Sequence, residues 1–229
     1  MKKLITFLAV SITAIAVAAA DPIIVGHGFV NFNALGTSFE NLSPVDVTSL
    51  TPIDEVDSFG AFGSNISAGG GVGVNIPFAG YFGVQPEVDL YVNRVGYKYD
   101  SVLYGSDAVA SFNYLSLDIP VLFTAKVEKW NFKVGPYVSI PLGNLKITHS
   151  NSSTNYSDDR KITSNAIFGM LAGIGYEERL GMGRIVFGVN YMLDFTPPVT
   201  IRNGSSDDYR LFTRRGLMID IGYKVPLSF

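Results

Sequence analysis

Apolar and polar residues alternate along most of this chain. From Leu115 to Val127 the odd positions are apolar and the even positions are mostly polar. A period of two residues is typical of a β-strand with one apolar face, whereas an amphipathic helix shows a period of about 3.6 residues. The same alternation resumes from Trp130 to Leu142 after only Glu128 and Lys129, and this spacing predicts a hairpin.

Eight segments show this alternation, so the sequence predicts eight strands. They are Ile23 to Leu35, Ala68 to Ile76, Phe82 to Asn93, Leu115 to Val127, Trp130 to Leu142, Phe168 to Tyr176, Ile185 to Phe195 and Leu217 to Phe229. Long connections, such as Asp100 to Ser111, the stretch after Gly143, and Thr196 to Arg214, alternate with tight turns. This order is typical of an all-β, eight-stranded antiparallel up-and-down transmembrane barrel with long external loops and short periplasmic turns.

The first twenty residues predict a secretory signal peptide. Lys2 and Lys3 precede an apolar run from Leu4 to Val17, and three alanines come directly before Asp21. A basic start, a short apolar run and small residues at the end form the pattern of a cleaved signal. We therefore expect residues 1–20 to be removed and residues 21–229 to form one outer-membrane barrel domain.

Composition excludes several other classes. Without the signal the formal net charge is −5, and nucleic-acid-binding proteins usually carry a clustered basic face, so no nucleic-acid partner is expected. The remaining chain has no apolar stretch near the 20 residues that a membrane-spanning helix needs. A secreted β-domain and an outer-membrane barrel are the two classes left.

Charged residues in the row opposite the apolar positions favour the membrane barrel. A lysine facing lipid at the bilayer midplane costs about 2–4 kcal/mol, so we expect this row to face the lumen. The predicted lumen charge network consists of Glu87, Asp89, Asp118, Lys126, Lys133, Asp194, Asp220 and Lys224. Symmetric hairpins would place Glu87, Lys126 and Lys133 in one cluster in the periplasmic half. The inverted arrangement, a soluble lipocalin-type barrel with an apolar interior, leaves the loop alternation unexplained.

Aromatic residues lie near the ends of the apolar rows. Such rings favour the interface between hydrocarbon and water. The predicted aromatic girdle consists of Trp130, Phe132, Tyr176, Tyr191, Phe195 and Tyr223.

Three segments resemble the PorT-like outer membrane protein β-barrel family, within the broad OmpA/OmpX-like class of small eight-stranded barrels. They are Asn113 to Phe123, with Tyr-Leu-x-x-x-Ile-Pro, Lys133 to Ser139, with Gly-Pro-Tyr, and Gly222 to Phe229. The resemblance implies a barrel in the cell outer membrane of a diderm bacterium. It also implies insertion by the barrel assembly machinery, for which the terminal Phe229 resembles the recognition signal. It brings no catalytic residue.

Residues able to carry catalysis or bind a metal are scarce. His27 and His149 are the two histidines, so a two-histidine metal site is not expected. The His149-Ser150 pair has no carboxylate nearer in sequence than Asp158 and Asp159. No helix follows the glycines of residues 69–73, which are therefore interpreted as strand glycines and not as a phosphate loop. We expect no catalytic residue, no metal site and no cofactor.

The predicted barrel size limits the function. Eight strands enclose an interior just wide enough for side chains or one small ligand. We therefore expect a lumen plugged by side chains and a structural or surface-interaction role through the external loops. The expected partners are outer-membrane lipid, the barrel assembly machinery and an extracellular partner that contacts the loops. The alternative is a narrow channel or a carrier for small hydrophobic molecules.

Overall fold

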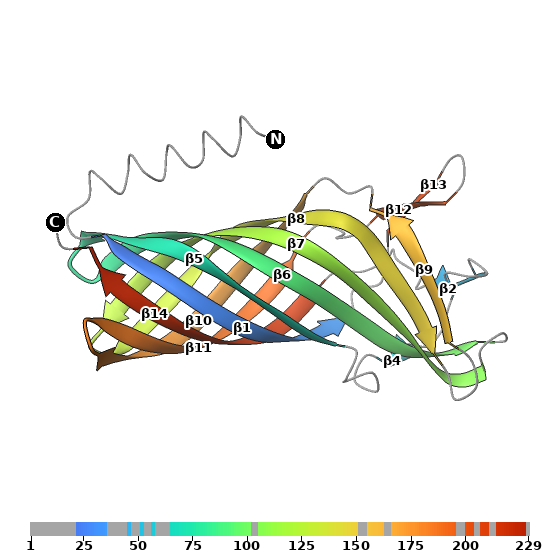
Figure 1. The fold of residues 1–229 in the computed structure, drawn as a ribbon, viewed down its shortest axis with the longest axis horizontal. Coiled ribbons are helices and arrows are strands. Elements are labelled where there is room, and N and C mark those ends of the chain that lie inside the picture. The colour runs from blue at the N-terminus through green and yellow to red at the C-terminus, as the bar shows by residue number, and fades with distance from the viewer. Residues whose placement is uncertain are drawn as a thin grey trace.

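The structure is a computed structural model, and its strands wrap into a closed barrel (Figure 1). It describes residues 22–35, 45–46, 51–52, 56–57, 65–101, 105–150, 155–162, 166–195, 200–203, 207–210 and 214–227. None of these residues forms a helix long and apolar enough to span a membrane. The expected signal peptide and Phe229 lie outside the described residues, so both stay predictions.

Eight long antiparallel strands close the barrel, which confirms the predicted fold class. They are β1 (Ile23–Leu35), β5 (Ile66–Ala79), β6 (Phe82–Ser101), β7 (Gly105–Val127), β8 (Trp130–Ser150), β10 (Ile167–Leu180), β11 (Gly183–Asp194) and β14 (Arg214–Pro226). Each strand pairs with the next long strand along the chain, and β14 pairs with β1 from Pro226 opposite Ile23 to Arg214 opposite Leu35. The sheet therefore has no open edge at the level of these eight strands.

Three two-residue turns lie at the end of the barrel where β1 begins and β14 ends (Figure 1). They join β5 to β6, β7 to β8, and β10 to β11. The first residue of each turn, Gly80, Glu128 or Gly181, has a positive φ of 52° to 61°. Tight hairpins require such backbone angles because the turn must match the twist of the two strands. Short turns mark the periplasmic end, so the opposite end faces outward.

An apolar band surrounds the outside of the barrel. On β8 the outward residues are apolar from Trp130 to Leu142, and the same row continues with the exposed polar residues Asn144 and Lys146. At a rise of about 3.4 Å per residue and a tilt of about 40°, the apolar stretch rises roughly 30 Å, the thickness of the hydrocarbon core. Ile221, halfway along β14, is 50% exposed, and Phe123, nearer the periplasmic end of β7, is 58% exposed. The apolar face therefore meets lipid, and the lipocalin-type alternative is wrong.

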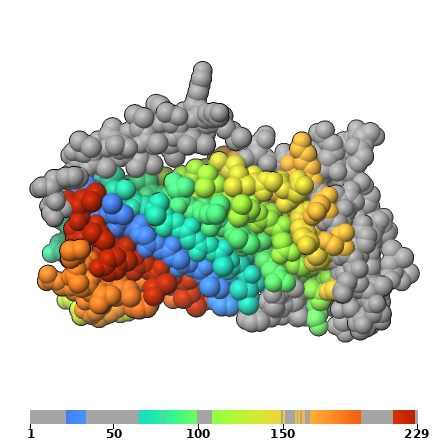
Figure 2. All heavy atoms as spheres, viewed as in Figure 1, coloured from blue at the N-terminus to red at the C-terminus, as the bar shows by residue number. Residues whose placement is uncertain are grey.

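The strands run obliquely and side by side across the surface (Figure 2). Three of them, β6, β7 and β8, extend further than the other five at the outer end (Figure 1). Two short strands pair with their edges, β4 (Val56–Asp57) with β6 and β9 (Asn155–Lys161) with β8. We call this part, formed by residues 94–101, 105–113 and 143–150 together with β4 and β9, the external sheet.

The external sheet corrects two loop predictions. Asp100 to Ser111 was expected to be a loop, but β6 and β7 stay paired up to Ser101 opposite Gly105. The stretch after Gly143 was also expected to be a loop, but it continues β8 to Ser150. The physical reason is that apolar residues still occupy alternate, inward positions of these extensions: Tyr97 and Phe112 are buried and stack with their ring centroids 5.8 Å apart.

Four further short strands lie outside the barrel. They form two separate hairpins, β2 (Val45–Asp46) with β3 (Thr51–Pro52) and β12 (Thr200–Asn203) with β13 (Asp207–Arg210).

The outward orientation is tested by placing arginine at two depths on one strand. Ile221→Arg puts a charge near the bilayer midplane and is expected to lower the free energy of unfolding by about 2–4 kcal/mol, whereas Val225→Arg, near the periplasmic interface, lowers it by about 0–1 kcal/mol. Unfolding in denaturant from lipid vesicles is followed through Trp130, the single tryptophan. Equal losses at the two positions would contradict the assigned depth.

Candidate functional site

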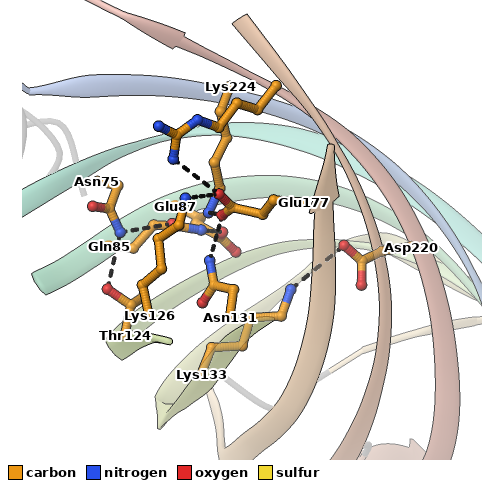
Figure 3. A network of polar contacts seen from close by, with 11 residues as sticks. Asn75, Gln85, Glu87, Thr124, Lys126, Asn131, Lys133, Glu177, Asp220 and Lys224 are labelled. Carbon is orange, nitrogen blue, oxygen red and sulfur yellow. Dashed lines mark hydrogen bonds and ion pairs between the residues drawn. The ribbon is translucent and has the colours of Figure 1, made fainter. Parts of the chain in front are cut away.

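Four side chains converge on the Glu177 carboxylate near the periplasmic opening of the lumen (Figure 3). Lys224 Nζ lies 2.5 Å from Oε1 and Asn131 Nδ2 lies 2.9 Å from it. Lys126 Nζ donates to Oε2, and Arg184 donates to the same atom at 3.4 Å. The five residues come from five strands, so Glu177 cross-links the lower lumen. Glu177 and Lys224 are both buried, which makes this ion pair sensitive to the loss of either partner.

A second layer of polar contacts lies next to the Glu177 contacts. Lys133 Nζ is 3.5 Å from Asp220 Oδ2, and Asn190 donates to the other oxygen of Asp220. On the opposite wall, Asn75 Nδ2 donates to Gln85 Oε1 at 3.0 Å and Gln85 donates to Glu87 Oε1 at 2.5 Å (Figure 3). Every charge in this layer is thereby held by a neighbour of complementary chemistry.

His27 lies beside two carboxylates on the inner wall. Its Nε2 atom is 3.0 Å from Asp89 Oδ1 and 3.8 Å from Glu87 Oε2. One ligand atom from each of these three residues lies within 4.8 Å of the other two. The prediction of no metal site considered two histidines only, and it did not consider one histidine with two acids.

Apolar side chains cross the lumen next to these charges. Seven strands each contribute one buried residue to this layer, and we call the layer the septum: Phe29, Tyr91, Leu122, Tyr137, Leu171, Met192 and Met218. The eighth strand, β5, contributes Gly69, where a Cβ would overlap the Phe29 ring. The Phe29 and Tyr91 rings meet edge to face with centroids 5.1 Å apart.

The septum leaves almost no free space. The cavity that remains between Phe29, Tyr137, Leu171 and their neighbours measures about 10 Å³. A water molecule needs roughly 10–15 Å³ and two or more polar partners, so this space is at the lower limit for a single water. On the periplasmic side, a wider cavity of about 230 Å³ is lined by Asn75, Lys126, Glu177 and other residues of the mouth. That cavity ends below the septum.

Polar groups border the septum and continue beyond it. Asp118, which lines the septum cavity, accepts at Oδ1 from Ser116 at 2.6 Å and from Ser139. Tyr137 spans two layers, because its ring belongs to the septum and its hydroxyl donates to Asp194.

The eight residues of the predicted lumen network all lie on the inward face of their strands. Six of them are buried, whereas the Lys126 and Lys133 side chains are 32% and 13% exposed. Their partners differ from the predicted Glu87, Lys126 and Lys133 cluster: Lys126 pairs with Glu177, Lys133 with Asp220, and Glu87 lies near His27. Closure of the sheet into a barrel brings β10 close to β7, and β14 close to β8, through the lumen. Hairpin symmetry considers only strands that are neighbours in the sheet, so it could not predict these pairs.

Sequence reasoning missed Glu177, the residue with the most partners in the lower lumen. Its strand was predicted to end at Tyr176, so Glu177 was left out of the predicted inward row. The available signal was the inward row Gly169, Gly173 and Gly175, which has a period of two and continues to Glu177.

The predicted aromatic girdle residues lie on the outer surface, at several depths. Trp130 and Tyr176 meet edge to face at 5.4 Å near the periplasmic turns, and Lys129 lies 5.7 Å above the Tyr176 ring. Lys129 lies in the turn between β7 and β8, and its hydrogen bond to Glu178 raises the pKa of Lys129. Tyr223 donates to the carbonyl of Leu180 at 2.7 Å at the same end. Phe132 lies one row above Trp130, Tyr191 lies in the outer half of β11, and Phe195 directly follows the last residue of β11.

Comparison with known proteins identifies a protein family that matches this chain. Residues 28–197 match the family model described as outer membrane protein beta-barrel domain. Curated proteins give no match to the sequence.

Several solved structures of outer-membrane barrels are similar at low sequence identity. Ail of Yersinia pestis shares 12% identity, with 89% of this chain and 98% of that chain covered and a TM-score of 0.36. Neisserial surface protein A shares 9% identity over 89% and 96%, with a TM-score of 0.40. OprG of Pseudomonas aeruginosa shares 14% identity over 90% and 96%, with a TM-score of 0.42.

The role of Glu177 is tested by Glu177→Gln. The substitution leaves Lys224 buried without its counter-charge, and breaking a buried pair typically costs about 3–5 kcal/mol of unfolding free energy. Denaturant unfolding followed by Trp130 fluorescence measures the loss. The neighbouring exposed Glu178, whose partner is Lys129, provides the matched control Glu178→Gln, for which we expect a much smaller loss. Similar losses for the two variants would show that Glu177 does not cross-link the lumen.

Proposed function

Because the chain belongs to the outer membrane protein beta-barrel domain family, we propose that it is a non-conducting barrel that holds an external sheet at the cell surface. The protein is an eight-stranded barrel of the bacterial outer membrane. Its role in this proposal is structural or interactive: the barrel anchors the chain in outer-membrane lipid, and the external sheet contacts partners outside the cell. No catalytic role is proposed.

The observation that carries this proposal is the septum. A conducting pore needs a continuous polar path, and an apolar layer contributed by seven strands interrupts that path. The charged layer on its periplasmic side is itself cross-linked through Glu177 and the Lys133–Asp220 pair. Both features favour a plugged lumen over a channel.

The external sheet supports an interaction role. It extends β6, β7 and β8 past the apolar band, and β4 and β9 pair with its edges. Its outward side carries the exposed charged residues Arg94, Lys146, Asp159 and Lys161. A paired sheet presents such charges in a fixed geometry, which a partner binds at a lower entropic cost than it would a mobile loop.

The second candidate function is a carrier for small hydrophobic molecules. The periplasmic cavity of about 230 Å³ has Ile23, Pro77 and Pro226 among its lining residues and is the observation that favours it. The cavity stops below the septum, so a carrier would need the septum to move. We rank this function below the interaction role for that reason.

Membership of the PorT-like group and recognition of Phe229 by the assembly machinery are further parts of the proposal.

Conductance tests the closed lumen. In planar bilayers the unmodified protein is expected to show no discrete channel openings. The triple variant Tyr91→Ala, Leu122→Ala and Tyr137→Ala truncates three of the seven septum side chains, both tyrosines among them, and is expected to conduct.

The matched control replaces three outward residues, Leu90→Ala, Phe123→Ala and Val134→Ala, which leaves the lumen unchanged and is expected to stay silent. Discrete openings of the unmodified protein would contradict the proposal and support the channel alternative.

Shortening the external sheet tests the interaction role. Replacing residues 99–108 with Asn-Gly joins β6 to β7 between Lys98 and Val109, which are opposite each other in the sheet. Bacteria that produce this variant at an unchanged level are expected to attach several-fold less to solid surfaces and to one another, with unchanged uptake of a small hydrophobic dye. Unchanged attachment together with reduced uptake would favour the carrier.

A further inference from the structure

We propose that His27, Glu87 and Asp89 bind a divalent transition-metal ion of the Zn²⁺ class inside the lumen. Four-coordinate Zn²⁺ holds ligand atoms at about 2.0–2.2 Å, which places neighbouring ligand atoms roughly 3.3–3.5 Å apart. The distances from His27 Nε2 to Asp89 Oδ1 and to Glu87 Oε2, 3.0 and 3.8 Å, lie on either side of that value. Two of the three donor pairs therefore have nearly the spacing of one coordination shell, and all three ligand atoms lie within 4.8 Å of one another.

The contact between His27 and the two acids is unusual because it joins strands that are not neighbours in the sheet. His27 is on β1 and the two acids are on β6, and β5 lies between these strands in the sheet. The two sides meet because β5 presents glycines at this level. Gly71 is opposite both His27 and Asp89, and a Cβ there would lie 2.8 Å from Asp89 Cα and overlap the Asp89 carboxylate. The glycine-rich segment of the sequence thus opens the space in which the three donors converge.

A neighbouring amide orients one of the proposed ligands. Gln85 Nε2 donates to Glu87 Oε1 at 2.5 Å, which leaves Oε2 directed toward His27. Gln85 is itself held by Asn75, whose amide also donates to Thr124 at 3.0 Å. Metal-binding carboxylates are generally hydrogen-bonded in this way, and loss of such outer contacts costs about 10–100-fold in metal affinity.

The local charge favours a cation. Glu87 and Asp89 are both buried beside His27, and Asp118, opposite Asp89 on β7, is a third buried acid next to Asp89. The nearby cation Lys133 is engaged by Asp220. A divalent ion would offset the excess negative charge in a region where buried carboxylates lose most of their hydration.

The donor types and the access route define the ion. One imidazole and two carboxylates suit Zn²⁺, Mn²⁺ or Fe²⁺, whereas Ca²⁺ takes six to eight oxygen ligands. A small cavity of about 20 Å³, lined in part by His27, Glu87 and Lys133, lies between the site and the periplasmic mouth. The septum closes the other side. Metal is therefore expected to enter from the periplasm.

Metal titration of the full chain tests the proposal. The protein, folded in detergent with any affinity tag and bound metal removed, is titrated with Zn²⁺ in competition with a chromophoric chelator. We expect one ion per barrel. His27→Gln and Glu87→Gln are each expected to weaken binding by more than about 100-fold, and Gln85→Leu by about 10–100-fold. Asp194→Asn, a buried lumen acid beyond the septum, is the control and should bind within about twofold of the unmodified protein.

A spectroscopic measurement on the unmodified protein keeps the test independent of variant folding. Co²⁺ bound by one nitrogen and two carboxylate oxygens at low coordination number gives visible absorption bands, which Zn²⁺ should abolish by displacement. Absence of these bands, or equal Zn²⁺ affinity in the unmodified and His27→Gln proteins, would overturn the proposal. Neither result bears on conductance or surface attachment, so it leaves the proposed function of the barrel unaffected.

Discussion

Hydrocarbon contains no hydrogen-bond partner for a peptide group, and this constraint shapes the whole molecule. Each backbone N–H and C=O at membrane depth must be satisfied within the protein, so a sheet in the bilayer has to close on itself. Pairing of β14 with β1 achieves this closure. Once the sheet is closed, the two-residue period separates the side chains into an apolar outer row and an enclosed inner row.

Enclosure then dictates the chemistry of the lumen. An eight-stranded barrel has room for little more than its own side chains, so every inward charge must find a partner or become costly. Glu177 meets this requirement for the lower lumen by accepting bonds from four residues. The septum meets it differently, because it fills the middle of the lumen with uncharged, mostly apolar side chains, and its tyrosine hydroxyls bond to Asn31 and Asp194. Inward glycines such as Gly69 provide the space for their larger neighbours.

The different ends of the barrel serve different purposes. At the periplasmic end the strands are joined by two-residue turns and the aromatic contacts of Trp130, Tyr176 and Tyr223. At the outer end the strands continue beyond the lipid and keep pairing, and their inward residues become apolar, as at Tyr97 and Phe112. The same backbone ladder therefore serves as a membrane anchor at one level and as a surface structure at the next.

The alternation of side chains by itself determined the fold class, the strands and the face of each residue, because these depend on neighbours two positions apart. Asp118 and Lys126 were predicted to point inward on that basis alone, and they do. Only the tertiary structure decided which inward groups meet. Lys126 reaches Glu177, 51 positions away, and His27 reaches Asp89 across an intervening strand. Those contacts depend on the stagger between strands around the closed barrel, a quantity set by all eight pairings together and by no local pattern.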